Sequence, residues 1–225
     1  MTRLSIIIPT LNEAATIRAT LKALQPLRDA GHELIVVDGG STDGTPDLAV
    51  GSVDVLLQAP RGRARQMNAG ARVATGEILW FLHADTLPIE QAGNLIVATL
   101  KQSGRRWGWF DVRLSGDRLL LRVVERFINR RSRLTHIATG DQGLFVMRDL
   151  FESLGGYPEI ALMEDVALCR TLKRLTLPLC LDATLVTSSR RWEQRGIVRT
   201  IVQMWCLRLA YALGMSPVRL ARWYQ

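Results

Sequence analysis

The chain has 225 residues, of which 48% are hydrophobic and 22% are charged, a balance that excludes an intrinsically disordered protein. This length is sufficient for one large domain, or for one domain with an appendage, around a substantial core. Lys and Arg outnumber Asp and Glu by 29 to 21, giving a net charge of +8. Such a surplus favours an anionic partner, such as a nucleotide phosphate, a nucleic acid or an acidic membrane surface.

The cysteine pattern argues for a reducing compartment. The chain has 3 cysteines, Cys169, Cys180 and Cys206, and no CxxC pair, which excludes a disulfide framework and a typical zinc site. The N-terminus lacks the pattern of a signal peptide, and no apolar run approaches the ~20 residues of a membrane-spanning helix. We therefore expect a cytoplasmic protein.

The first part of the chain alternates predicted strands and helices. The first helix is expected to begin at Asn12 and to carry Ile17, Leu21 and Leu24 on one face. The strand–helix alternation predicts a parallel, doubly wound α/β sheet with right-handed crossovers. The predicted strands are Leu4–Pro9, Leu34–Asp38, Val53–Leu57 and Ile78–Leu82.

The last of these strands runs directly into His83 and Asp85. Its continuous apolar sequence is typical of a central strand in a parallel sheet, and ligands bind at the carboxyl ends of such strands. A carboxylate delivered there is a hard oxygen ligand for a divalent cation on a phosphate. Alternatively, Asp85 only caps the next helix.

The pattern is less regular in the second part of the chain. Its predicted elements are a helix containing Leu95–Leu100, a strand at Trp107–Leu114, an amphipathic helix at Arg118–Arg131, a short strand at Leu144–Met147 and a helix at Glu164–Leu175. The last helix begins with two adjacent carboxylates, Glu164 and Asp165. These are either a chemical pair or acids that favour the positive end of a helix.

Residues 190–225 are expected to form a basic helical tail attached to a domain of residues 1–189. One face of the tail carries Ile197, Ile201, Met204 and Trp205. A basic amphipathic helix with Trp is typical of a membrane-surface element when its apolar face is free. The same face could instead cover the core or pair two chains.

Four motifs resemble those of the family 2 glycosyltransferases, in the same order and from about Leu4 to Leu175. The motifs are Ser-Ile-Ile-Ile-Pro-Thr-Leu-Asn-Glu at residues 5–13, Val-Val-Asp-Gly-Gly-Ser-Thr-Asp-Gly-Thr at 36–45, His-Ala-Asp-Thr at 83–86 and Met-Glu-Asp at 163–165. The resemblance implies a GT-A (nucleotide-diphospho-sugar transferase-like) α/β fold, with a mostly parallel central sheet flanked by helices and a basic helical C-terminal tail. His-Ala-Asp-Thr together with Gly-Asp-Gln-Gly at 140–143 further resembles a bacterial subgroup found beside radical-enzyme and selenium-related genes.

The resemblance also implies a site for a nucleotide-diphosphate sugar. The nucleotide contacts that it implies, with the arginines favoured for the phosphates, are Pro9, Thr10, Glu13, Asp38, Arg61, Arg65, His83 and Asp85. Asp85 matches the metal-binding acid, so Mg²⁺ or Mn²⁺ on the donor diphosphate is expected. His83 replaces the family's first Asp, which lowers the negative charge of the site by one.

The catalytic residues implied are Asp165, as the base that deprotonates the acceptor hydroxyl, and Glu164 beside it. Asp141, Gln142 and Trp107 are expected to face the acceptor or the donor sugar, although core packing competes for the tryptophan. The implied reaction is an inverting hexosyl transfer from a UDP- or GDP-sugar. The acceptor could be lipid-linked, which would place the enzyme at the inner face of the membrane.

Other classes of function remain as alternatives. A non-catalytic nucleotide-sugar-binding or scaffold protein could share this fold, although Asp85 and Asp165 are both present. A nucleotidyltransferase is expected to have a glycine-rich phosphate loop, which Asp38-Gly39-Gly40 does not match. Nucleic-acid binding is suggested only by the positive charge, because the sequence has no helix-turn-helix, RNA-recognition or zinc motif.

Overall fold

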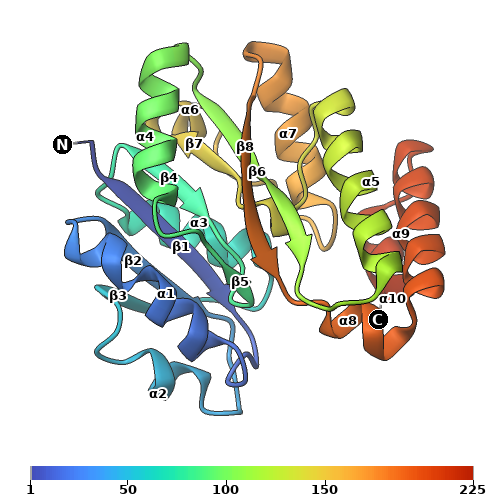
Figure 1. Cartoon of the computed structure of the whole chain (residues 1–225), viewed down its shortest axis with the longest axis horizontal. Helices are drawn as coiled ribbons and strands as arrows, with labels where there is room; N and C mark the ends of the chain where they lie inside the picture. The colour runs from blue at the N-terminus through green and yellow to red at the C-terminus, as the bar shows by residue number, and fades with distance from the viewer. Residues whose placement is uncertain (1, 225) are drawn as a thin grey trace.

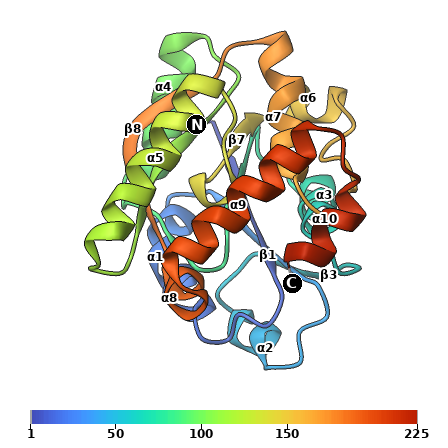
Figure 2. The same cartoon turned by 90° about the vertical axis from the view of Figure 1, so that its right-hand side faces the viewer.

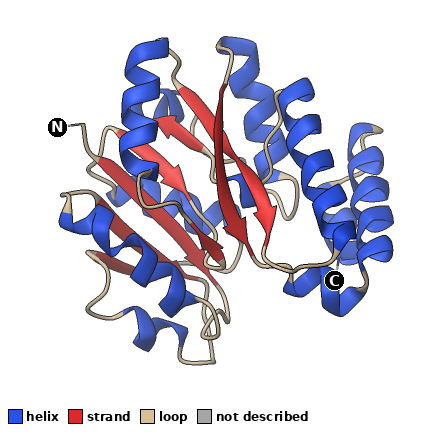
Figure 3. Ribbon diagram, in the orientation of Figure 1, coloured by secondary structure: helices blue, strands red, loops and turns tan. Residues whose placement is uncertain are grey.

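The computed structural model describes residues 2–224, in which one mixed sheet is flanked by helices on both faces (Figure 1, Figure 3). The described strands lie side by side in the order β3-β2-β1-β4-β7-β6-β8-β5. They are β1 (Leu4–Thr10), β2 (Glu33–Asp38), β3 (Val55–Gln58), β4 (Ile78–Phe81), β5 (Thr86–Leu87), β6 (Trp107–Leu114), β7 (Phe145–Met147) and β8 (Leu179–Thr187).

The helices fall into two layers and a C-terminal group. Helices α1 and α4 pack on one face of the sheet, and α3, α6 and α7 pack on the other. The described helices are α1 (Ile17–Asp29), α2 (Thr45–Ala49), α3 (Arg63–Val73), α4 (Ala92–Ser103), α5 (Leu119–Thr135), the 3₁₀ turn η1 (Gly140–Gln142), α6 (Arg148–Ser153), α7 (Glu164–Leu175), α8 (Arg190–Arg195), α9 (Ile197–Ala212) and α10 (Pro217–Tyr224).

The first four strands of the chain, β1 to β4, form the parallel part of the sheet. Strand β1 pairs with β2 on one side and with β4 on the other, and Ile6 is opposite both Leu34 and Trp80. Ile6 packs in the core beneath α1, whereas Ile7 packs in the core beneath α3. Both faces of β1, β2 and β4 are buried, which explains why their sequences are continuously apolar instead of alternating.

The remaining part of the sheet is mixed. Strand β7 runs antiparallel to β4 and to β6, while β8 runs parallel to β6 and β5 antiparallel to β8. Because β7 is antiparallel to β4, the residues that precede β7 lie beside the end of β4. The backbone N–H of Phe81 donates to the carbonyl of Leu144 at 2.9 Å. This reversal brings the loop at residues 139–143 to the same edge as His83 and Asp85.

Two local expectations differ from the structure. Asn12 does not cap α1, because Thr16 is the residue before that helix and Asn12 adopts a left-handed conformation with φ 56°. The Asn12 side chain instead accepts a hydrogen bond from the backbone of Thr42 at 2.9 Å. Strand β8 was not predicted, since its half-exposed residues do not form a continuous apolar run.

The C-terminal helices pack against the rest of the chain (Figure 2). Leu207 of α9 and Leu220 of α10 are buried in one cluster with Met163 and Val166 at the start of α7. Ile197 at the start of α9 is buried against α5 in a second cluster. No helix within residues 2–224 is both long and apolar enough to cross a membrane.

Candidate active site

The candidate site lies where the parallel strands β1, β2 and β4 end. Thr10 and Asp38 are the last residues of β1 and β2, and they are opposite each other in the sheet. His83 and Asp85 follow β4, on the other side of β1. Neighbouring parallel strands end at one edge, so these polar residues gather there as the sequence predicts.

The carboxylate of Asp38 organises the turn after β2. It accepts hydrogen bonds from the backbone N–H groups of Gly40 and Ser41 at 2.9 Å each, and from the Thr10 hydroxyl at 3.2 Å. Thr10 and Asp38 are each only 1% exposed, whereas Pro9 is half-buried. The Thr10 and Asp38 side chains are therefore turned inward, and their contact with a nucleotide stays a prediction.

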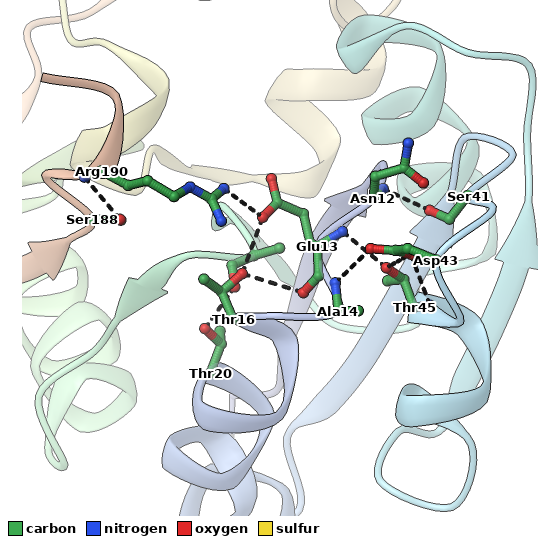
Figure 4. Close-up of polar contacts among 11 residues, drawn as sticks. Asn12, Glu13, Ala14, Thr16, Thr20, Ser41, Asp43, Thr45, Ser188 and Arg190 are labelled. Atoms are coloured by element: carbon green, nitrogen blue, oxygen red, sulfur yellow. Dashed lines mark hydrogen bonds and ion pairs between the residues drawn. The ribbon is translucent and has the colours of Figure 1, made fainter. Parts of the chain in front are cut away.

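The loop after β1 connects to the C-terminal tail through Glu13, as Figure 4 shows. The Glu13 carboxylate accepts hydrogen bonds from the Thr16 hydroxyl at 3.0 Å and from the Arg190 guanidinium at 3.3 Å. Asp43 holds the neighbouring turn, because its carboxylate accepts from the backbone of Ala14 and Thr45. Asp43 is therefore a turn residue, while the nucleotide contact of Glu13 stays a prediction.

The loop before β7 connects the end of β4 to the start of α7. The imidazole Nδ1 of His83 lies 3.0 Å from a carboxylate oxygen of Asp141. The backbone N–H of Gly140 donates to Asp165 Oδ2, also at 3.0 Å. Gly140 has no space for a side chain, since a Cβ there would lie 2.4 Å from His83 Nε2. His83, Asp141 and Asp165 are thus brought together around one glycine.

The environments of the two loop acids shift their pKa values in opposite directions. Burial raises the pKa of the Asp85 carboxyl; His83 opposes this shift, and the negative charges of Asp141 and Glu13 reinforce it. Burial acts in the same direction on Asp141, but the His83 hydrogen bond and nearby positive charge hold its pKa below the usual value. Asp141 is therefore the better compensated of the two acids.

The chemistry of Asp85 fits a divalent cation shared with a diphosphate. Burial and neighbouring carboxylates disfavour its negative charge, and a cation would stabilise it. Within residues 2–224, no group of three or more His, Cys, Asp or Glu side chains could hold a metal ion by itself. Mg²⁺ is commonly bound by one or two carboxylates together with substrate phosphates, so a single protein carboxylate is sufficient there.

The paired acids occupy the first turn of α7. Glu164 is 7% exposed, and burial together with the charge of Asp165 raises the pKa of its carboxyl. Asp165 Oδ2 accepts the Gly140 N–H described above, and its other oxygen faces the backbone N–H of Val166 at 2.7 Å. Met163, which precedes them, has φ 71°, a strained conformation that clusters at functional sites.

The sequence model of glycosyl transferase family 2 matches residues 5–155, which include the ends of β1, β2 and β4 and the loop before β7. The chain belongs to glycosyl transferase family 2. A PGL/p-HBAD biosynthesis glycosyltransferase of Mycobacterium tuberculosis is 32% identical over 177 residues, covering 68% of this chain and 62% of that protein. The probable glycosyltransferase YdaM of Bacillus subtilis is 28% identical over 244 residues, covering 96% of this chain.

This family 2 chain spans 62% and 56% of the lengths of these two relatives. Solved structures share its fold. The mannosyltransferase PcManGT of Pyrobaculum calidifontis, in complex with GDP-Man and Mn²⁺, has a TM-score of 0.67 and 24% identity, covering 92% of this chain and 61% of that one. S. aureus TarS 1–349 in complex with UDP has a TM-score of 0.68 and 17% identity, covering 83% and 60%. The GT-A fold expected for a family 2 chain is thereby confirmed.

Two of the residues expected to face sugar or acceptor lie in the core of the family 2 fold. Trp107 is fully buried, and its indole N–H donates to the carbonyl of Thr176 at 2.9 Å. Gln142 is also fully buried, and its side-chain oxygen accepts from the Ser132 hydroxyl at 2.7 Å. The structure corrects both assignments: Trp107 is a core residue, and Gln142 fixes the 139–143 loop. Only Asp141 of the three predicted residues reaches the site.

The nucleotide contacts of Arg61 and Arg65 stay predictions, and the arginine between them also lies near the acids. Arg65 forms an exposed ion pair with Glu159 at 3.3 Å, and Arg61 is exposed. Arg63, between them, is close enough to lower the pKa values of Asp85 and Asp141. The Arg-Gly-Arg-Ala-Arg sequence alone does not show which side chain turns toward the acids, because all three lie around the start of one helix.

Sequence reasoning missed the contribution of the tail to this site. Arg191 of α8 lies near Asp141 and Asp85, and it packs over the Tyr224 ring at 3.8 Å from the centroid. Burial and the neighbouring arginines lower the pKa of Arg191 to about 10. Arg191 belongs to a basic run of the tail, and from the sequence alone this run is equally consistent with a solvated helix face. Only the packing of the tail identifies Arg191 as a residue of the site.

Proposed function

We propose that this family 2 chain is an inverting glycosyltransferase that moves a sugar from a UDP- or GDP-sugar to an acceptor hydroxyl. The observation that carries the proposal is the convergence of Asp85 after β4 and Asp165 at α7 on the 139–143 loop. Two 3.0 Å contacts, from His83 to Asp141 and from Gly140 to Asp165, connect the two sides. Solved neighbours with GDP-Man and Mn²⁺, or with UDP, support a nucleotide sugar as donor.

In this proposal Asp165 accepts the proton of the acceptor hydroxyl while the hydroxyl oxygen bonds to the anomeric carbon. The bond from that carbon to the diphosphate oxygen breaks in the same displacement, so the configuration at the carbon inverts. Gly140 holds the Asp165 carboxylate in place through its backbone N–H. Glu164 lies buried beside that base, and burial together with the charge of Asp165 raises the pKa of its carboxyl.

The leaving diphosphate requires positive charge near Asp85. Arg63 at the start of α3 and Arg191 of α8 supply part of it, because both lie close to the acids of the loop. Asp85 would hold Mg²⁺ or Mn²⁺ jointly with the diphosphate, and the metal would neutralise negative charge on the leaving group. Complexes of the neighbouring PcManGT and of a mycobacterial glucosyl-3-phosphoglycerate synthase contain Mn²⁺.

The motif His-Ala-Asp-Thr, combined with Gly-Asp-Gln-Gly, supports membership of the bacterial subgroup with radical-enzyme and selenium gene neighbourhoods. The structure gives this combination a physical basis. His83 of the first motif pairs with Asp141 of the second, and Gly140 leaves room for the imidazole ring. We propose that the pair replaces the first acid of the usual family motif, with His83 directed at the ribose.

A thermal-shift screen of UDP- and GDP-sugars, with and without Mn²⁺, tests the donor and the metal. A ligand at about 100 times its dissociation constant raises the free energy of unfolding by about 2.7 kcal/mol. We expect one nucleotide sugar to stabilise the protein more strongly with Mn²⁺, and Asp85→Asn to remove that metal-dependent difference. Asp29→Asn, an exposed change at the C-terminal end of α1, serves as the matched control.

Turnover assays with the ligands found in the screen separate the alternative functions. Stabilisation without sugar transfer to any acceptor would favour a nucleotide-sugar-binding or scaffold protein. Release of pyrophosphate from a nucleoside triphosphate and a sugar phosphate would favour a nucleotidyltransferase. An Asp85→Asn variant that keeps the full Mn²⁺-dependent shift would contradict the metal assignment.

We also propose peripheral contact with the inner face of the membrane through an outer apolar face on α5 and α9. Its members are Leu120, Val123 and Phe127 of α5 with Val198, Val202, Trp205 and Leu209 of α9, all at least half-exposed. The rings of Phe127 and Trp205 are 5.2 Å apart, which joins the two helices into one surface. Arg118, Arg126 and Arg130 are exposed on α5 or next to it. Aromatic residues with arginines favour an anionic lipid boundary, where a lipid-linked acceptor would be reached.

A further inference from the structure

Two half-buried arginines, each with one buried side-chain nitrogen, lie near the proposed catalytic acid without an ion-pair partner in residues 2–224. They are Arg131 of α5 and Arg208 of α9. The Arg131 Nε and Arg208 Nη2 atoms are buried and have no hydrogen-bond partner among the described residues. Neither guanidinium belongs to any of the ion pairs in that part of the chain.

The packing places both arginines at the start of α7. Arg131 donates to the Ser132 hydroxyl at 2.8 Å, and Ser132 donates in turn to the side chain of Gln142 at 2.7 Å. Gln142 is in the loop whose Gly140 N–H holds Asp165. On the other side, Leu207 of α9 precedes Arg208 and is buried with Met163 and Val166, the residues that bracket the acid pair.

The charges of the two arginines are not compensated by direct contact. The Asp165 carboxylate is close enough to favour the charged form of both, yet its oxygens interact with the backbone of Gly140 and Val166. Burial and the charge of Arg208 lower the pKa of Arg131 to about 9. A cation with a buried, unpaired nitrogen costs free energy, so this arrangement needs a reason beyond stability.

We propose that Arg131 and Arg208 bind an anionic group of the acceptor, a phosphate or a carboxylate, beside Asp165. Guanidinium groups bind oxyanions through pairs of parallel hydrogen bonds, and two of them in a partly dry site favour a group with several acceptor oxygens. Binding the anion there holds the acceptor while its hydroxyl faces Asp165. The identity of the substrate as an acceptor rests on the proposed function, whereas the anion site rests on the two arginines themselves.

The test uses the full chain and two probes, inorganic phosphate and acetate, at ionic strength held constant with chloride. We expect phosphate, acetate or both to raise the melting temperature of the parent protein, and the better probe to indicate the class of anion. Arg131→Gln and Arg208→Gln should each weaken the binding of that probe by about tenfold or more, since charge-assisted hydrogen bonds are lost. Arg131→Lys, which keeps the charge, should retain part of the response.

Two control variants locate the response. Arg199→Gln, an exposed change on the same helix α9, should leave the response unchanged. Arg63→Gln, on the side expected to hold the donor diphosphate, should retain most of it. Without any added anion, Arg131→Gln and Arg208→Gln should be at least as stable as the parent, because each removes an unpaired and partly buried charge. A purely structural role predicts the opposite change.

The proposal is overturned if neither probe stabilises the parent protein, or if Arg131→Gln and Arg208→Gln respond like the parent. It is also overturned if only Arg63→Gln loses the response, since the anion would then occupy the donor side. Binding of nucleotide sugars, measured on Arg131→Gln and Arg208→Gln, should change less than about threefold. If the parent binds nucleotide sugars but its anion response does not depend on Arg131 or Arg208, only this inference is contradicted. If the anion response depends on Arg131 and Arg208 but no nucleotide sugar binds, the proposed function is contradicted and the anion site is supported.

Discussion

At the scale of single residues, the acids at the sheet edge are differentiated by what surrounds them. The Asp38 carboxylate accepts hydrogen bonds from its own turn, and the Asp141 carboxylate is stabilised by His83. Burial and neighbouring acids disfavour the negative charge of Asp85. Glu164 is buried, whereas Asp165 is fixed by the backbone of Gly140. In the proposed site, similar carboxylates would therefore serve as a turn residue, a partner for His, a metal ligand and a base.

The assignment of Asp165 as base makes a direct prediction. Asp165→Asn keeps an oxygen that can accept the Gly140 N–H but removes the ability to take a proton. We expect nucleotide-sugar affinity within a few-fold of the parent and a transfer rate lower by about 10²–10⁴-fold. Asp117→Asn, an exposed change, is the control. Transfer at the parental rate by Asp165→Asn would direct attention to Glu164 or Asp141 as the base.

Glu164 predicts how stability depends on pH. Its raised pKa means that the folded protein holds this proton more tightly than the unfolded chain does. The corresponding stabilisation is present below the ordinary pKa of 4.5 and is lost as the pH rises through the higher folded-state value. Glu164→Gln lacks this loss, so its free energy of unfolding relative to the parent should increase as the pH rises above about 4.5.

Urea unfolding from about pH 4 to pH 8 measures this difference. Glu152→Gln, which changes an exposed carboxyl, should follow the parent curve across the range. A difference between Glu164→Gln and the parent that stays constant with pH would contradict the inferred environment of Glu164.

At the scale of elements, the reversal of β7 builds the site. A parallel strand in this position would begin at the opposite edge, far from the end of β4. Because β7 is antiparallel to β4, its preceding loop supplies Asp141 to His83 and Gly140 to Asp165. Helix α10 has a comparable structural role, since its single buried residue, Leu220, packs against the start of α7.

The packing of α10 is tested by a matched pair of substitutions. Leu220 is fully buried, so Leu220→Ala should lower the free energy of unfolding by about 2–5 kcal/mol. Val218 on the same helix is 58% exposed, so Val218→Ala should change it by less than about 0.5 kcal/mol. Equal effects, measured by urea unfolding, would show that α10 does not dock through Leu220.

At the scale of the whole molecule, the basic tail returns across the domain and completes the site edge. Arg190 contacts Glu13, 177 residues earlier in the sequence, and Arg191 lies near Asp141. The inner side of the tail is thus used for packing, and its outer side carries exposed apolar residues. Of the face predicted on α9, Ile197 is buried, whereas Trp205 is 57% exposed. Packing on the core therefore leaves the proposed membrane contact available.

The outer apolar face predicts binding to anionic vesicles. The full chain should sediment with vesicles rich in an anionic phospholipid and remain in solution with purely zwitterionic ones, because each arginine contributes about 1 kcal/mol at an anionic surface. Phe127→Ser combined with Trp205→Ser should weaken binding by more than about tenfold while leaving the melting temperature nearly unchanged. The alternative outcome is a dimer in analytical ultracentrifugation that dissociates on the same double substitution, with no sedimentation on vesicles.

The sequence by itself determined the strands β1, β2 and β4 and the acids that follow or begin the neighbouring elements. Such strands can be predicted from the local sequence because every residue of a strand that is buried on both faces tends to be apolar. The motif spacing likewise placed His83 and Asp85 after a strand and Glu164 and Asp165 at a helix start, as the structure has them.

The tertiary structure decided which side chains face the site. Asp38, Gln142 and Trp107 turn inward because their polar atoms find partners in the chain, and no local pattern distinguishes such a partner from a ligand. The sequence also did not predict that Arg131, Arg191 and Arg208 lie near the acids. Their positions depend on how α5, α8 and α9 pack around those acids. Local sequence records burial along one element, whereas charge placed between distant elements appears only when the chain is folded.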